Sequence, residues 1–87
     1  MESKMKYKYV LSLLTENTFD IFQRISIVFS RNRLFIQQLK FESIGYGGGC
    51  TFSIETRADE KTMERIINQL QNIFDLLEVN VIERTML

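Results

Sequence analysis

Residues 9 to 33 have the sequence Tyr9-Val-Leu-Ser-Leu-Leu-Thr-Glu-Asn-Thr-Phe-Asp-Ile-Phe-Gln-Arg-Ile-Ser-Ile-Val-Phe-Ser-Arg-Asn-Arg33. The first part alternates along the chain as a strand does, until the polar segment Thr15-Glu-Asn17. From there the apolar residues recur at helical spacing, at Phe19, Ile21, Phe22, Ile25, Val28 and Phe29. The change of period predicts a strand over residues 6–15, a short turn, and a helix from about Thr18 to Asn32.

The turn between these two elements is the first candidate site. We expect Asn17 to be the N-cap of the helix, with Asp20 three residues later in the place of the acidic partner of a capping box. The first N–H groups of a helix lack partners and attract anions, so the carboxylate of an amino acid would fit here. The simpler interpretation is that Asn17 and Asp20 only cap the helix. The three arginines of the helix and its end, Arg24, Arg31 and Arg33, lie off its apolar stripe, and we expect them to be solvated.

A second strand and a hairpin follow. Residues 34–44 predict a strand whose apolar parity shifts, and a bulge near Gln37-Gln38 would explain the shift. The segment Gly45-Tyr-Gly-Gly-Gly49 predicts a hairpin loop, and it lacks the Lys and Ser/Thr of a phosphate-binding loop. Residues 50–57 alternate cleanly, which predicts a third strand with Cys50 pointing inward beside Phe52 as a core residue.

The last part of the chain predicts a helix and a strand. Asp59 or a neighbour caps the helix, whose apolar positions are Met63, Ile66, Ile67, Leu70, Ile73 and Phe74. Asp75 ends it, and Leu77, Val79 and Val81 then alternate with polar residues in a short strand. The complete order is β-α-β-β-α-β.

This order predicts an α+β protein, a ferredoxin-like βαββαβ sandwich with a four-stranded antiparallel sheet and two helices on one face. We expect residues 1–87 to form a single domain. The other face of the sheet would be uncovered and half apolar, with Tyr7, Tyr9, Leu11 and Leu13 or their strand neighbours on it. We therefore expect a homodimer.

Composition narrows the class of partner. Eleven Lys and Arg balance eleven Asp and Glu, so no long-range field attracts nucleic acid or an anionic membrane. One Cys excludes an internal disulfide, and without His or a Cys pair we expect no metal site. No run approaches the length of a membrane span or a secretory leader, so we expect a soluble, cytoplasmic protein. No catalytic constellation is present, and we predict that this chain is not an enzyme by itself.

Four segments together resemble the ACT domain of the small, regulatory subunit of acetolactate synthase. They are Leu11-Ser-Leu-Leu-Thr-Glu-Asn17, Arg24-Ile-Ser-Ile-Val-Phe-Ser-Arg31, Ile36-Gln-Gln-Leu39 and Ile67-Asn-Gln-Leu-Gln-Asn-Ile-Phe-Asp-Leu-Leu-Glu-Val79. Each segment is weakly specific alone, but their order and spacing cover nearly the whole chain.

The resemblance implies a non-catalytic subunit that dimerises through ACT domains and activates a large catalytic subunit in branched-chain amino acid biosynthesis. Thiamine diphosphate, FAD and magnesium would belong to the catalytic subunit, so we expect no cofactor in this chain. The chain would be of the short type with one ACT domain.

The resemblance also implies an effector site for valine, where the first turn of one protomer faces the start of the second strand of the other. The matching positions here are Asn17, Thr18, Phe19, Asp20, Ile21, Phe35 and Ile36. Asn17 fits the family pattern, but Phe19-Asp20 replaces its Pro-Gly, and Phe35 replaces its Asn. Asp20 adds a negative charge where a ligand carboxylate would lie, and Phe35 removes a polar group. We expect valine to bind weakly or not at all.

Two other functions compete with this interpretation. A free-standing ACT module that senses another amino acid or regulates another enzyme needs only the same fold and dimer. An RNA-binding domain is disfavoured, because Gly48-Gly49 lies where a base-stacking aromatic would be needed and the net charge is zero.

Overall fold

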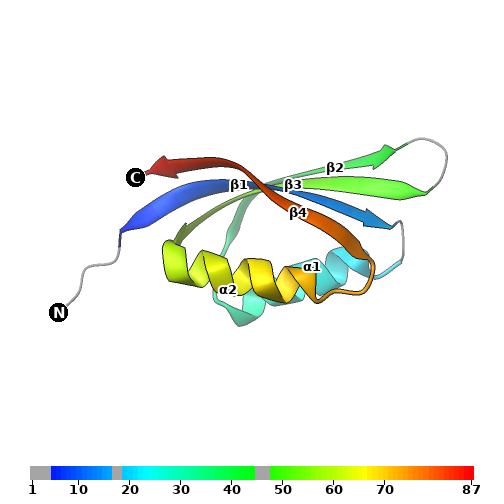
Figure 1. The fold of residues 1–87 in the computed structure, drawn as a ribbon, viewed down its shortest axis with the longest axis horizontal. Helices are drawn as coiled ribbons and strands as arrows, with labels where there is room; N and C mark the ends of the chain where they lie inside the picture. Colours follow the sequence, from blue (N-terminus) through cyan, green and yellow to red (C-terminus); the bar gives the residue numbers. More distant parts are fainter. Residues whose placement is uncertain (1–4, 17–18, 45–47) are drawn as a thin grey trace.

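The computed structural model describes residues 5–16, 19–44 and 48–87. Six elements follow one another: β1 (Lys6–Glu16), α1 (Ile21–Arg31), β2 (Ile36–Ile44), β3 (Gly49–Asp59), α2 (Glu60–Gln71) and β4 (Leu76–Met86). The strands form one antiparallel sheet in the order β2-β3-β1-β4. Both helices cover the same face of that sheet (Figure 1). The predicted ferredoxin-like βαββαβ sandwich is confirmed.

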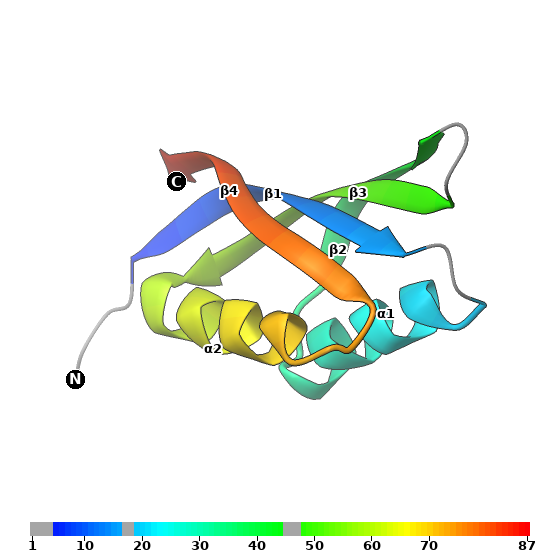
Figure 2. The ribbon, with the colours of Figure 1, turned by 45° about the vertical axis from the view of Figure 1, so that its right-hand side comes forward.

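The inward face of the sheet is built by alternation along β1 and β3. Leu11 and Leu13 are completely buried on β1, and on β3 Cys50 lies inward beside Phe52, as predicted. The helices contribute Ile21, Ile25 and Phe29 from α1 and Met63, Ile66 and Leu70 from α2. These side chains belong to one hydrophobic cluster. The helices lie side by side as one layer beneath the sheet (Figure 2).

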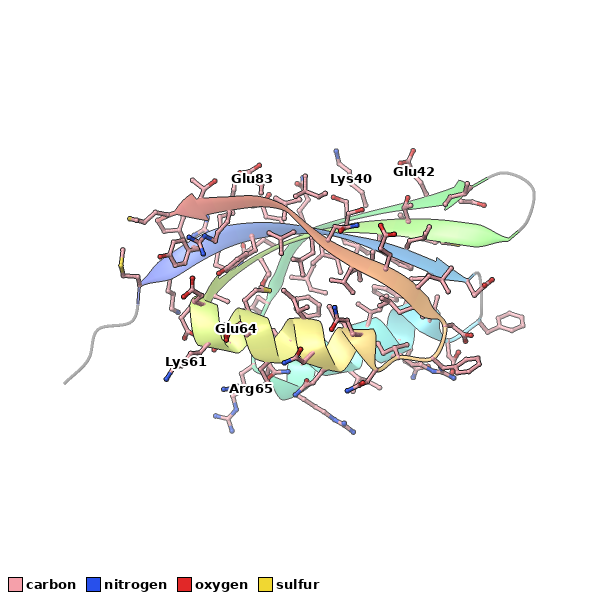
Figure 3. All side chains as sticks on the ribbon, in the orientation of Figure 1. Lys40, Glu42, Lys61, Glu64, Arg65 and Glu83 are labelled. Atoms are coloured by element: carbon pink, nitrogen blue, oxygen red, sulfur yellow. The ribbon has the colours of Figure 1, made fainter. Side chains whose placement is uncertain are left out.

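The outward face of the sheet is formed by one of the two sets of residues that the prediction allowed. Tyr9, Leu11 and Leu13 face the helices, so their strand neighbours occupy the other face. There Ser12 pairs with Ser53 on one side and with Asn80 on the other. Lys40, Glu42 and Glu83 also point away from the helices (Figure 3). The second alternative of the prediction therefore holds, and on β1 this open face carries Val10 and Leu14 beside the polar Lys8 and Ser12.

Both helices are shorter than predicted. Helix α1 begins at Ile21 rather than Thr18. Helix α2 begins as expected, with the Asp59 side chain accepting from Thr62 N at 2.8 Å, but it ends at Gln71. The chain then turns, with Leu76 N donating to Ile73 O, so that Leu76 enters the core. Phe74 is left exposed instead of continuing the apolar stripe of α2.

Irregular pairing shapes the two edge strands. The register of β2 against β3 shifts between Ile36 and Gln38, which confirms the predicted bulge. Strand β4 is longer than expected, and its register against β1 shifts near Leu77 and near Ile82. The shift near Leu77 puts Leu76 inward and leaves Leu77 exposed, so the predicted alternation was wrong at Leu77, whereas Val79 packs against the core. No helix within the described residues is long and apolar enough to cross a membrane.

Candidate functional site

The candidate effector site begins where β1 ends. Glu16 N donates to Asp75 O at 2.8 Å, which ties the end of β1 to the connection between α2 and β4. Thr15, one residue earlier, is completely buried, and its hydroxyl has no hydrogen-bond partner among the described residues. Asn17 and Thr18 lie outside the described residues, but α1 begins at Ile21 with Asp20 as its N-cap residue, so the expectation that Asn17 is the N-cap was wrong.

Asp20 occupies a different position from the one expected. It is itself the N-cap residue of α1, and within the described structure its side chain makes no capping hydrogen bond. The carboxylate instead accepts from Arg24, with Nε to Oδ2 at 2.9 Å. The expected capping box with Asp20 as its acidic partner was therefore wrong, because Asp20 is drawn to a cation one turn along the helix.

Arg24 joins two carboxylates at this end of the molecule. Besides Asp20, its Nη1 lies 3.7 Å from Oδ2 of Asp75, which follows α2. The expectation that Arg24 is simply solvated was wrong, although the spacing of four residues between Asp20 and Arg24 was a signal of this pair in the sequence. Asp75 is distant in sequence and carried no such signal. Arg24 therefore lies between two carboxylates at this end of the molecule.

The other candidate residues divide into exposed and buried ones. The Phe19 side chain is fully exposed beside the start of α1. Ile21 is buried in the core, and Ile36 is half-buried against it. The two isoleucines therefore position the backbone of the site. Phe35 is exposed, and its carbonyl oxygen accepts from Thr56 Oγ1 at 2.7 Å.

Asp20 and Phe35 lie at opposite ends of the folded protomer. Ile36 lies in the same row of the sheet as Thr56 and Tyr9. From Tyr9 to Glu16, where the turn begins, β1 advances seven residues, roughly 23 Å at the usual rise of a strand. A single chain therefore does not bring the two halves of the candidate site together.

Strand β2 is an edge strand that carries exposed apolar side chains. Within the described chain it pairs only with β3. Phe22 of α1 and Phe41 of β2 contact the buried ring of Phe52, with ring centroids 6.2 and 5.1 Å away. Both remain about half exposed, and Leu39 lies beside them on β2. These three side chains therefore form a partly exposed apolar face next to the open edge of the sheet.

Comparison with solved structures agrees with the topology. The small subunit of acetolactate synthase from Thermotoga maritima superposes with a TM-score of 0.77 at 21% identity, over 87% of this chain and 47% of that one. The ACT domain of GTP pyrophosphokinase from Chlorobium tepidum superposes with a TM-score of 0.75 at 12% identity, over 88% of this chain and 99% of that one. The chain thus spans about half the length of the acetolactate synthase subunit.

Comparisons of the sequence, by contrast, give no match. No protein-family model matches the chain. No curated protein matches it either. What the comparisons show is the fold: this chain has the ferredoxin-like architecture of ACT domains.

Proposed function

We propose that this chain is a non-catalytic regulatory subunit that pairs with a second copy and activates the catalytic subunit of acetolactate synthase. The observation that carries the proposal is that roughly 23 Å of strand β1 separates the sheet row of Ile36, next to Phe35, from Glu16, where the turn toward Asp20 begins. Strand β2, which follows Phe35, is an open sheet edge within the described chain. A ligand that contacts both halves would therefore need a partner copy to supply one of them. The four resembling sequence segments and the superposition with an acetolactate synthase small subunit support the choice of enzyme.

The second copy pairs along β2 in this proposal. The edge offers unpaired backbone groups, and Phe22, Leu39 and Phe41 offer apolar surface next to it. Antiparallel pairing of two β2 strands places the start of one strand beside the end of the other. Phe35 of one copy then approaches the end of the molecule that carries Asp20 in the other.

The dimer is tested by sedimentation velocity on the wild type and on Leu39→Lys. A lysine on an edge strand opposes strand pairing, so the variant is expected to sediment as a monomer at concentrations where the wild type is a dimer. Ile82→Lys, an equally drastic change on the opposite edge strand β4, is the matched control and should remain a dimer. A dimeric Leu39→Lys protein would contradict pairing along β2.

Valine feedback is weak or absent in this proposal. The carboxylates of Asp20 and Asp75 share one arginine, so the surroundings of Asp20 repel a second carboxylate. Phe35 presents a ring where the resembling family has an amide. Thiamine diphosphate, FAD and magnesium are assigned to the catalytic subunit, and none to this chain.

The functional test is the rate of acetolactate formation by the catalytic subunit from the same source, with and without this chain. A rise in rate that valine does not reverse is the expected result. No rise and no co-elution would contradict the proposal. They would favour the alternative, an ACT module that serves another enzyme, which the full-length superposition with the GTP pyrophosphokinase ACT domain supports.

A further inference from the structure

Strand β2 offers a regular stretch of open edge with a defined midpoint. Its pairing with β3 shifts register between Ile36 and Gln38 and is then regular from Gln38 to Ile44, where the strand ends. Within the described chain no strand pairs with the other side of this stretch. Phe41 is its middle residue. Two copies that pair antiparallel over the whole stretch therefore meet at Phe41.

The outward face of this stretch carries one charge of each sign. Lys40 and Glu42 lie two residues apart, and both point away from the helices (Figure 3). Both residues are exposed, and neither forms an ion pair within the described part of the chain. Their neighbours on β3 are Ser53 and Thr51, which carry no charge. The two charges are therefore available to a strand that pairs with this edge.

The charges select one register for a second copy. In a two-fold antiparallel pair centred on Phe41, Lys40 of each copy lies opposite Glu42 of the other, so two opposite-charge pairs form. A pair centred on Lys40 would oppose the two lysines, and one centred on Glu42 would oppose the two glutamates. A centre at Leu39 or Ser43 would leave only the three end residues of each regular stretch paired.

The helix side of the same edge is apolar and fits the same register. Phe41 contacts the buried ring of Phe52, with ring centroids 5.1 Å apart, and stays about half exposed. In the register centred on Phe41, the two Phe41 rings meet at the two-fold axis, with Leu39 of each copy opposite Ser43 of the other. Antiparallel two-fold pairing keeps the helices of both copies on one side of the joined sheet. Phe22, which stacks on the same Phe52 ring, therefore adds to the contact.

We propose that two copies of this chain pair along β2 in the register centred on Phe41, with Lys40 of each copy paired with Glu42 of the other. The inference rests on the proposed function and specifies the contact between its two copies. An edge with one charge of each sign on either side of its midpoint is complementary to itself. It therefore favours a second copy over a strand that carries charges of one sign.

This register also brings the partner copy to the candidate site. Gln38 of the partner copy lies opposite Ile44, and the sheet row of Ile44 contains Glu16, the last residue of β1. Phe35 of the partner copy lies three residues before its Gln38. It therefore extends roughly 10 Å beyond that row, toward the end of the molecule that carries Asp20.

The charge pairs are tested by the dissociation constant of the dimer, measured by sedimentation equilibrium. Lys40→Glu and Glu42→Lys each put like charges at both cross-strand positions, so each variant alone should dimerise at least about tenfold more weakly. An equimolar mixture restores two opposite-charge pairs in the mixed dimer, whose dissociation constant should lie within about threefold of the wild-type value. These differences should be smaller at about 300 mM salt than at about 50 mM, because salt screens exposed charges.

Lys61→Glu and Glu64→Lys are the matched controls. Both side chains are exposed on helix α2 and not on the sheet edge, and each substitution reverses the same charge. Each control should dimerise within about twofold of the wild type. The proposal is overturned if the mixture of Lys40→Glu and Glu42→Lys pairs no better than either variant alone, or if the controls weaken pairing as much. Rescue by mixing also shows that both variants fold.

Cysteine cross-linking tests the register itself. Phe41 lies opposite its own copy, so Phe41→Cys should form a disulfide-linked dimer on oxidation, since opposite Cα atoms in antiparallel strands lie about 4.5 to 5.5 Å apart. Leu39 lies four residues along the strand from its own copy, roughly 13 Å away, so Leu39→Cys should stay unlinked. The native Cys50 is completely buried and should not contribute.

Three outcomes separate this inference from the proposed function. A linked Leu39→Cys dimer with an unlinked Phe41→Cys chain would overturn the register alone. A wild-type chain that sediments as a monomer would overturn both the register and the pairing in the proposed function. A chain that pairs in this register without raising the rate of acetolactate formation would support the inference and contradict only the choice of enzyme.

Discussion

Two buried threonines on the inward face of the sheet should respond oppositely to the same substitution. Thr15 and Thr56 are both completely buried. The Thr56 hydroxyl donates to the carbonyl oxygen of Phe35 at 2.7 Å, whereas the Thr15 hydroxyl has no partner among the described residues. Replacing each by valine keeps the shape of the side chain and puts a methyl group in place of the hydroxyl. The comparison therefore isolates the energetic effect of a hydrogen bond.

The two changes in the free energy of unfolding can be estimated separately. An unsatisfied buried hydroxyl costs about 1 to 3 kcal/mol, so Thr15→Val should stabilise the chain by about 1 kcal/mol or more. A typical internal hydrogen bond contributes about 1 kcal/mol net, so Thr56→Val should destabilise it by about that amount. The apolar contribution of the added methyl group is common to both variants and largely cancels in their difference.

Thermal unfolding followed by circular dichroism gives a direct comparison. For a domain of this size 1 kcal/mol corresponds to about 4 to 8 °C, so the two midpoints should differ by roughly 8 to 16 °C. A drop in the midpoint of Thr15→Val as large as that of Thr56→Val would refute the reasoning. It would mean that the Thr15 hydroxyl is hydrogen-bonded in the folded protein.

Three further predictions concern the helix cap, a surface ion pair and the thiol. Asp59→Ala should lower the free energy of unfolding by about 1 kcal/mol in urea titrations, because the Thr62 N–H loses its acceptor; an unchanged midpoint would contradict the cap. Lys8 Nζ lies 3.0 Å from a carboxylate oxygen of Glu83, and its hydrogen bond holds the pKa of Glu83 below the ordinary value of 4.5. The pair therefore stabilises the fold above pH 4.5, and this contribution is lost as the pH falls through the lowered pKa. Glu83→Gln should therefore lose less stability than the wild type between pH 5 and 3, and equal losses would refute it. Cys50 is completely buried, so its reaction with a thiol reagent should be at least about a thousandfold slower in the native protein than in denaturant, and fast native labelling would contradict its place in the core.

The sequence was sufficient for the topology because each element buries one regular stripe. The alternation of Cys50, Phe52 and Ile54 and the helical spacing of Met63, Ile66 and Leu70 both survive unchanged in the core. Periodicity fails where tertiary contacts end an element early. Ile73 and Phe74 continue the spacing of α2, but the helix ends before them, and the chain turns so that Leu76 enters the core.

The candidate site was less predictable for the same reason. The pair of Asp20 and Arg24 follows from their spacing on one helix, but the second acid, Asp75, comes from a segment fifty-one residues further along than Arg24. The composition of the outward face likewise depends on register across four strands. The alternation of β1 alone, with Val10 and Leu14 on that face, does not show which neighbours surround them.

Because Asp20 and Phe35 lie far apart on one chain, effector binding at these residues is coupled to dimerisation. A ligand that touches both must touch two copies, so it binds the proposed dimer and not the single chain. By mass action, a ligand present at one hundred times its Kd stabilises the state that binds it by about 2.7 kcal/mol, which is roughly a hundredfold in the pairing constant. Weak valine binding therefore predicts that the dissociation constant of the dimer, measured by sedimentation equilibrium, stays the same when millimolar valine is added. A hundredfold tightening by valine would show that Asp20, although paired with Arg24, leaves room for a ligand carboxylate at the start of α1.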